Sequence, residues 1–176
     1  MVEALFSTRG AKMESGRFCF LSDQYYEDFK DEYLMQNKEE VDGINHNRPC
    51  FFVFCDNAIP EIFWLVPISS NYLKYKTLHD KKIQKYGKCN TIRFGEVLGR
   101  QAAFLIQNMC PVIERYVHEI YVDKNGTAIK IDDRIVNDVI VNAREVLAIT
   151  KRGIRIIFPD VNAIYKKLCE QIIQMK

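Results

Sequence analysis

The sequence predicts a single α+β domain, in which a compact, twisted antiparallel sheet or partial barrel carries added helices. Three observations favour this fold class. Short apolar segments with turn residues between them fill the middle of the chain, helical patterns lie near residues 22, 70, 132 and 160, and neither repeats nor linkers divide the 176 residues. We therefore expect one domain over residues 16–176, preceded by a mobile tail over residues 1–15.

The first half of the chain predicts a strand, a helix and a hairpin. Arg17–Leu21 is a short apolar strand, and Ser22 or Asp23 can cap the helix that follows. A polar loop then leads to two dense apolar strands with a turn at residues 57–60 between them, so these strands should pair as a hairpin. The two hairpin strands are Pro49–Phe54 and Ile62–Val66.

The second half predicts three helices around further short strands. The helices are expected at Ser69–Tyr86, where Gly87 ends the pattern, from Asp132 or Asp133 to about Arg152, and from Pro159-Asp160 onward. Between the first two helices, the strands or apolar segments are Thr91–Val97, Ala103–Ile106, Met109–Val112, Val117–Val122 and Thr127–Ile131.

Positive charge is concentrated in one part of the chain. The whole protein carries a net charge of only +2, but the segment from Tyr72 to Arg100 holds eight basic and two acidic residues. Its local charge of +6 leaves −4 for the remainder, and such asymmetry indicates a polyanionic partner, which we expect to be RNA. The alternative is a solvated helix face whose lysines serve only solubility.

Two hydroxyls, Ser69 and Ser70, follow the strand that ends near Pro67, and they are candidates for RNA chemistry. A metal-free ribonuclease needs a base for the 2′-hydroxyl proton, an acid for the leaving 5′-oxygen and cations around the phosphate. If a helix begins near Ser69, its free N–H groups favour phosphate binding, and Lys74 would share a face with Ser70. The alternative is a serine that only caps the helix.

Arg48 and His46 are further catalytic candidates at the start of the neighbouring strand. Arg48 could hold a phosphate bidentately at the same end of the sheet, and His46 has a suitable pKa range for acid–base work. A loop histidine can also be merely solvent-exposed. Stacking and charge make a larger set candidates for RNA binding: Tyr72, Tyr75, Lys76, His79, Lys81, Lys82, Lys85, Lys88 and Arg93.

Several other classes of protein are not supported by the sequence. No Walker, dinucleotide-binding, zincin or serine-hydrolase motif occurs, so we expect no cofactor. The six cysteines include no CxxC pair, and Cys50 and Cys55 are predicted to point to opposite faces of one strand, so we expect free thiols and no metal ligands. Because no membrane-length apolar segment or signal peptide is visible, we expect a cytoplasmic protein.

In its motifs, the chain resembles the toxins of type III toxin–antitoxin systems, the ToxN/AbiQ group. The similar segments are Arg48-Pro49-Cys50-Phe51-Phe52, Trp64-Leu65-Val66-Pro67-Ile68-Ser69-Ser70, Lys85-Tyr86-Gly87-Lys88-Cys89-Asn90-Thr91-Ile92, Phe94-Gly95-Glu96-Val97-Leu98-Gly99 and residues 103–111. The CptN branch is the most similar. The resemblance runs from Arg17 to the C-terminal helix.

The resemblance implies a fold like the Kid/MazF antiparallel barrel and a metal-independent endoribonuclease that leaves a 2′,3′-cyclic phosphate. It also implies a small pseudoknotted RNA antitoxin, which the toxin cuts from a repeat precursor and with which it closes into a cyclic assembly, besides cellular RNA substrates. The family's hydroxyl pair corresponds to Ser69 and Ser70, and its basic residue to Arg48. Where related toxins have a lysine two residues after the pair, this chain has Tyr72, and a family tyrosine upstream has no match.

Three interpretations therefore stay open at the level of sequence. The chain could be an RNA-cleaving toxin, a non-catalytic RNA-binding module with a basic helix face, or a protein-interaction domain whose lysine helix meets an acidic partner. Turnover of RNA without metal separates the first from the second. Steep salt dependence of RNA binding separates both from the third.

Overall fold

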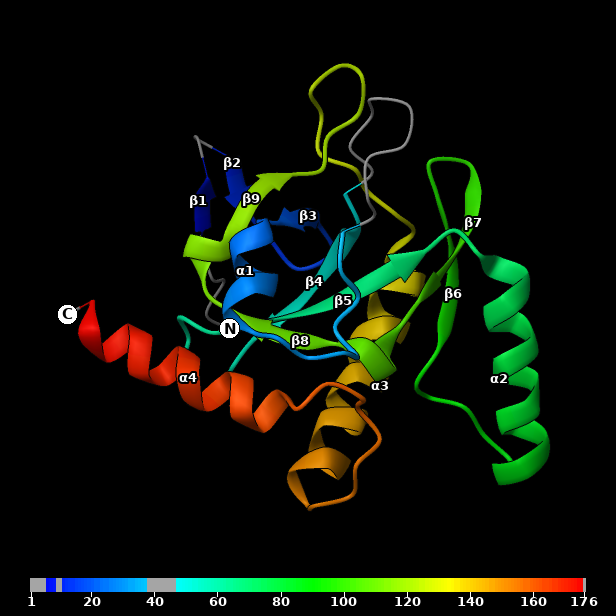
Figure 1. The fold of residues 1–176 in the computed structure, drawn as a ribbon. Helices are drawn as coiled ribbons and strands as arrows, with labels where there is room; N and C mark the ends of the chain where they lie inside the picture. The colour runs from blue at the N-terminus through cyan, green and yellow to red at the C-terminus, as the bar shows by residue number, and fades with distance from the viewer. Residues whose placement is uncertain (1–5, 9–10, 38–46, 176) are drawn as a thin grey trace.

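The computed structural model describes residues 6–8, 11–37 and 47–175 and shows an α+β fold (Figure 1). The strands of the main sheet are β3 (Phe18–Leu21), β4 (Pro49–Cys55), β5 (Phe63–Ser69), β6 (Arg93–Val97), β7 (Arg100–Phe104), β8 (Cys110–Val112) and β9 (Val117–Ile120). The helices are α1 (Asp23–Asp28), α2 (Tyr72–Tyr86), α3 (Asp133–Lys151) and α4 (Val161–Gln174), with 3-10 turns at Ile106–Asn108 and Glu114–Tyr116.

The main sheet is antiparallel and open, which confirms the predicted fold class. Its strand order is β6-β7-β5-β4-β3-β9, and β8 pairs with β5 off this path. The predicted hairpin of β4 and β5 forms its centre. One edge of β5 is shared, because β8 pairs with its first half and β7 pairs with its last two residues.

Alternation of side chains along β4 and β5 builds a hydrophobic core on each face of the sheet. On one face, Phe52 and Leu65 pack with residues of α1 and α4, such as Leu168. On the other face, Phe51 packs with residues of α3, such as Val139. α1 and α3 consequently lie on opposite sides of the sheet (Figure 1).

The β6–β7 hairpin extends the sheet and carries α2 on one face. Ala103 of β7 packs with Tyr75 of α2 in a small separate cluster. Its neighbours Ala102 and Phe104 belong to the core on the α3 side. β6 and β7 therefore have α2 on one side and α3 on the other, and Figure 1 shows α2 standing beside them.

The start of α2 differs from the prediction. Ser69 is the last residue of β5, and Asn71 is the N-cap, whose side-chain oxygen accepts a hydrogen bond from the backbone N–H of Lys74 at 3.3 Å. A helix beginning near Ser69 is therefore wrong, because Ser69 remains paired with β7. Ser70 precedes the helix, so helical spacing does not place it on one face with Lys74.

A β-bulge in β4 corrects the prediction for the cysteines. The register against β5 shifts between Phe52 and Phe54, which leaves Val53 without a paired residue on β5. This extra residue reverses the alternation, so Cys50 and Cys55 face the same core rather than opposite faces. All six cysteines are free thiols, and four of them are buried.

Two further segments differ from simple sequence expectations. Thr127–Ile131, predicted as a strand, makes only an isolated bridge between Val122 and Ala128. Within the predicted tail, β1 (Phe6–Thr8) and β2 (Ala11–Met13) pair with each other beside β9. Across the described part of the chain, no helix combines the length and apolarity needed to cross a bilayer.

Candidate functional site

Arg48 is anchored at the end of β5, immediately beside the serine pair. Its Nη1 donates to the carbonyl oxygen of Ile68 at 3.0 Å, and its Nε donates to the carbonyl oxygen of Gln36 at 3.4 Å. Its backbone N–H is bound by the side chain of Asn37 at 3.1 Å. A guanidinium has five N–H donors, so three remain without an acceptor among the described residues. Arg48 thus lies where the sequence predicted, with donors left for a phosphate.

The two serines have different surroundings. Ser69 pairs with Ala103, and its Oγ accepts a hydrogen bond from the backbone N–H of Asn71 at 3.2 Å, which holds the turn into α2. Ser70 is exposed and lines a cavity that Ser69 does not line. Successive strand residues point to opposite faces, which explains the division. Only Ser70 presents its side chain to the cavity.

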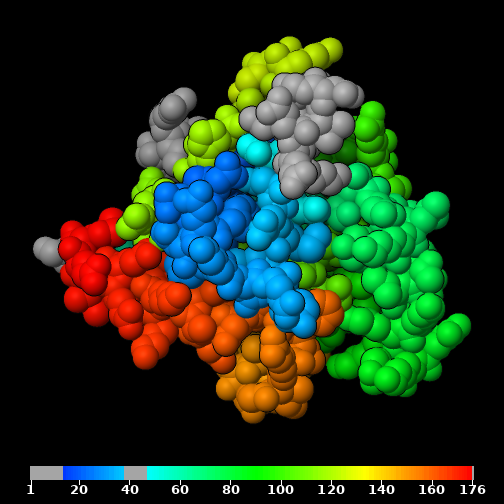
Figure 2. Space-filling view, in the orientation of Figure 1, coloured from blue at the N-terminus to red at the C-terminus, as the bar shows by residue number. Residues whose placement is uncertain are grey.

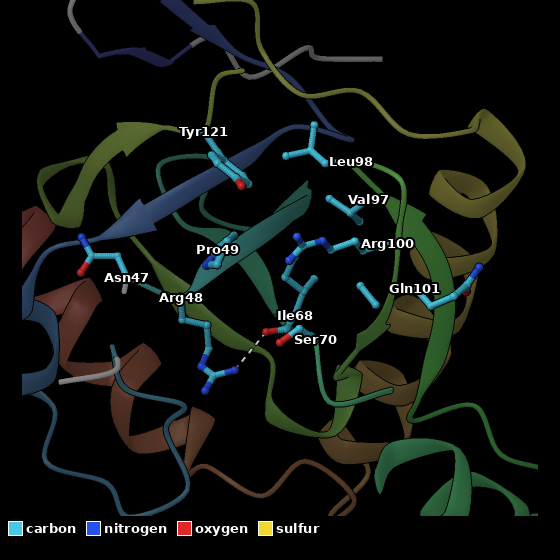
Figure 3. Close-up of a pocket in the computed structure, with 11 residues that line it drawn as sticks. Asn47, Arg48, Pro49, Ile68, Ser70, Val97, Leu98, Arg100, Gln101 and Tyr121 are labelled. Atoms are coloured by element: carbon cyan, nitrogen blue, oxygen red, sulfur yellow. Dashed lines mark hydrogen bonds between the residues drawn. The ribbon is translucent and has the colours of Figure 1, made fainter. Parts of the chain in front are cut away.

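The cavity, of about 440 Å3, opens at this end of the sheet (Figure 3). Its walls come from the start of β4, the end of β5, the β6–β7 hairpin and the segment after β9. The polar residues that line it are Asn47, Arg48, Ser70, Arg100, Gln101 and Tyr121. Among the described residues that line it, none is acidic, and this described lining favours an anionic ligand.

Three lysines of α2 form an exposed stripe on the outer face of the helix. Lys74, Lys81 and Lys85 are separated by seven and then four residues, which places them on one side of a helix. All three are exposed, and none has a carboxylate partner within the described residues. The ammonium of Lys85 lies 5.0 Å from the ring centroid of Tyr86. This lysine stripe (Lys74, Lys81 and Lys85) is the part of α2 that is free to attract a polyanion, and α2 occupies one side of the molecular surface in Figure 2.

Two members of the predicted RNA-binding set are occupied inside the protein. Lys82 donates to the side chains of Thr91 and Gln107, both at 2.7 Å, and burial lowers its pKa. Arg93 donates to both carboxylate oxygens of Asp138 on α3, at 2.6 and 3.1 Å. These contacts join α2, the sheet and α3, so they indicate structural roles.

Three more predicted RNA-binding residues have acidic neighbours. Lys76 contacts both carboxylate oxygens of Asp80 at 2.6 Å, and His79 Nδ1 lies 3.1 Å from the same carboxylate. Lys88 is exposed but lies 3.1 Å from Glu145. Pairing lowers the contribution of these cations to a surface field, although exposed pairs of this kind exchange partners at little cost.

The two tyrosines predicted to stack on bases are packed against the protein. Tyr75 is only 7% exposed, and the ring of Tyr72 packs edge-on against Phe94 at 5.1 Å. Lys74 lies above Tyr75, with Nζ 5.5 Å from the ring centroid, and is not a lining residue of the cavity. Tyr75 therefore lacks the open ring face that stacking requires, and Tyr72 is half-buried.

His46 lies outside the described residues, so its predicted role remains a prediction. Three residues of the cavity were missed by the sequence reasoning, namely Arg100, Gln101 and Tyr121. A local signal existed for the first of them. Leu98 and Gly99 have φ values of 51° and 74°, which form the tight turn that starts β7 at Arg100. Leu-Gly between two short strands could have indicated this turn.

A second, smaller cavity of about 210 Å3 surrounds a buried carboxylate, Asp56, between β4 and α3. Asp56 accepts hydrogen bonds from Tyr165 Oη at 2.9 Å, Trp64 Nε1 at 3.3 Å and two backbone N–H groups. Burial, the largest single effect, disfavours its charged form, but these donors together outweigh it and lower its pKa. Because its oxygens are satisfied, Asp56 is a structural anchor. Across the described residues, no three His, Cys, Asp or Glu side chains form a group that could hold a metal ion.

Comparison with known proteins identifies the fold but no relative by sequence. No protein-family model matches the chain, and no curated protein matches it. Eight chains of solved structures match its fold. One is AbiQ, a lactococcal anti-phage endoribonuclease belonging to the type III toxin–antitoxin system, with a TM-score of 0.65 over 91% of this chain and 98% of that chain. The sequence identity is only 13%. The chain therefore has the same overall fold as AbiQ across almost its entire length.

Proposed function

We propose that this protein is a metal-independent, sequence-selective endoribonuclease toxin of a type III toxin–antitoxin system. The observation that carries this proposal is the AbiQ-like fold, which extends over 91% of the chain. The motif resemblance to the same group supports it independently of the fold. The cavity adds a chemical argument, because Arg48 and Ser70 both line it and the part of its lining that the structure describes includes no acidic residue.

In the proposed reaction, the RNA supplies its own nucleophile. The ribose 2′-oxygen loses its proton and bonds to the phosphorus, while the bond from phosphorus to the 5′-oxygen breaks and that oxygen gains a proton. The products are a 2′,3′-cyclic phosphate and a 5′-hydroxyl, with no change of oxidation state. Ser70 and the free N–H groups of Arg48 would stabilise the charge on the phosphoryl oxygens.

The remaining assignments are proposals on the same basis. The proton carrier is proposed to be His46, with Lys74 as a cation that attracts the RNA from α2 and Ser69 as the hydroxyl that holds the turn beside Ser70. The partner would be a small pseudoknotted RNA, cut by the toxin from a repeat precursor and closed with it into a cyclic assembly of the CptN type. Phage defence, in the cytoplasm, would be the biological role. The lysine stripe is suited to such a partner, since lysines attract phosphates without fixing one geometry.

The test is cleavage of RNA in the absence of available metal. The purified chain is incubated with a randomised single-stranded RNA pool in excess EDTA, and the new ends are sequenced and analysed chemically. We expect 5′-hydroxyl and 2′,3′-cyclic phosphate ends at a preferred sequence. Ser70→Ala protein, purified in the same way, controls for contaminating ribonucleases.

Three other results would each contradict the proposal, wholly or in its mechanism. Intact RNA that binds the protein with steep salt dependence would show a non-catalytic RNA-binding module. Intact RNA without binding would favour a protein-interaction domain. Cleavage that requires added Mg²⁺ would retain the ribonuclease but exclude the proposed mechanism.

A further inference from the structure

Arg100 occupies a position in the cavity that the family motifs do not indicate. We propose that Arg100 is a second phosphate-binding catalytic residue, which contacts the reacting phosphodiester from β7 while Arg48 contacts it from β4. This inference rests on the proposed ribonuclease function and names a further residue of the same site. It rests on strand order, register, the hairpin turn and the charges around the cavity.

Strand order places the two arginines on either side of Ser70. β5, which leads into Ser70, lies between β4 and β7 in the sheet. Arg48 immediately precedes β4, and Arg100 is the first residue of β7. The strands that start at or next to the two arginines therefore flank the strand that leads into Ser70, and all three residues line the same cavity.

Register gives Arg100 the same face of the sheet as Ser70. Ser69 pairs with Ala103, so continuing the antiparallel register brings Ala102 beside Ser70. Arg100 precedes Ala102 by two residues, at the start of β7, and its side chain is therefore on the same face of the sheet. The Cα atoms of the two residues are about 7 Å apart along the strand. A long arginine side chain covers that span. Figure 3 shows Arg100 extending from β7 toward the middle of the lining residues.

The hairpin turn fixes where Arg100 begins. Val97 and Arg100 are paired across a two-residue turn, in which Leu98 and Gly99 both have left-handed backbone angles. Such turns match the twist of the flanking strands and set their register. Arg100 is thus presented by a short, defined hairpin rather than by a long loop.

The electrostatic surroundings distinguish Arg100 from the other arginine of this hairpin. The guanidinium of Arg93 is neutralised by Asp138, whereas that of Arg100 has no hydrogen-bond or ion-pair partner among the described residues. Two guanidinium groups line one cavity, and none of the described residues that line it with them is acidic. Their mutual repulsion is relieved when an anion binds between them, and a phosphodiester has the charge and the acceptor geometry for both.

The experiment measures cleavage and binding separately. Single-turnover cleavage of the RNA sequence preferred by the wild-type protein is measured in EDTA, and affinity is measured with the 2′-deoxy form of that sequence, which cannot be cleaved. Arg100→Gln should slow cleavage by about 10²-fold while changing the dissociation constant by less than about tenfold. Arg100→Lys should keep the affinity but lose most of the rate, because an ammonium lacks the bidentate fork.

Arg152→Gln is the matched control, since it removes the same charge from an exposed arginine at the end of α3. It should change neither quantity. A wild-type rate in Arg100→Gln, or equal losses of rate and affinity, would overturn the assignment. A lowered melting temperature of the Arg100 variants would do so as well, since it would show a structural role. If the wild-type protein cuts no RNA, the proposed function fails and the inference fails with it, whereas active wild type with unaffected variants contradicts only the inference.

Discussion

Ser70→Ala and Ser69→Ala should have unequal effects, although the two serines are adjacent and chemically identical. Ser70 lines the cavity, and a hydroxyl that stabilises only the transition state contributes about 10²–10³-fold in rate, or about 2.7–4 kcal/mol. Ser69 binds the backbone N–H of Asn71 at 3.2 Å. Losing that bond should cost about 0.5–1.5 kcal/mol of stability, and less where water replaces it. We therefore expect Ser70→Ala to be almost inactive and Ser69→Ala to retain most of its rate.

The assay is single-turnover cleavage with the protein in excess, so that product release does not limit the measured rate. Urea unfolding of both variants determines the free energy of unfolding under the same conditions. If both variants lose the same rate and keep their stability, the inference that only Ser70 of the two serines acts in the cavity is wrong. If the Ser70→Ala protein cleaves RNA at the full rate, the reacting phosphate does not bind in this cavity.

The remaining predictions concern charge, stability and proton transfer. Lys81→Ala and Lys85→Ala should weaken RNA binding and lower the slope of log affinity against log salt by roughly 0.7–1 each, as a salt titration would show. Lys82→Ala should lower the melting temperature instead, and an unchanged value would contradict its structural role. Asp56→Asn should reduce the free energy of unfolding by about 1–3 kcal/mol at neutral pH, measured in urea. Because the folded state lowers the pKa of Asp56, the difference in free energy of unfolding between the wild type and this variant should narrow as the pH falls below about 4. A difference that does not change with pH would show that Asp56 is not charged in the folded protein. His46→Ala should slow cleavage by about 10²-fold and remove a titration of the cleavage rate between about pH 5.5 and 7.5, and an unchanged pH profile in the variant would exclude His46 as the proton carrier.

The fold was predictable where local patterns determine the structure. α3 and α4 have amphipathic patterns, and their N-caps are Asp132, one of the two residues that the sequence offered, and Asp160, which lies at the predicted start of the last helix. The hairpin of β4 and β5 follows from two apolar segments around a turn. The bulge at Val53 was not predictable, because an extra residue changes no local pattern and is defined only by the pairing with β5.

The candidate site was predictable only in part, for a related reason. Arg48 and Ser70 lie at the ends of two consecutive strands of one hairpin, so pairing those strands already brings them together. Arg100 reaches the cavity only because β7 pairs with the last residues of β5, and that choice of partner depends on the whole sheet. Likewise, the partners of Lys82 and Arg93 are distant in sequence, so no local pattern could separate these cations from the free lysines.

Within the described chain, the unpaired cations of the cavity and of α2 form two groups that suit different tasks. The arginines Arg48 and Arg100 line the cavity, and the lysine stripe lies on the outer face of α2, which covers the opposite side of the β6–β7 hairpin. A guanidinium fork can fix one phosphate in a set geometry, whereas lysines hold a mobile strand by charge alone. The residues from Ser69 to Asn71 connect the two surfaces, because they join β5 directly to α2. An RNA strand that crosses this junction would be held on α2 by the charge of the lysines alone. At Ser70, its phosphate would be held in one geometry. For this reason, substitutions in the stripe should change mainly affinity and those in the cavity mainly rate.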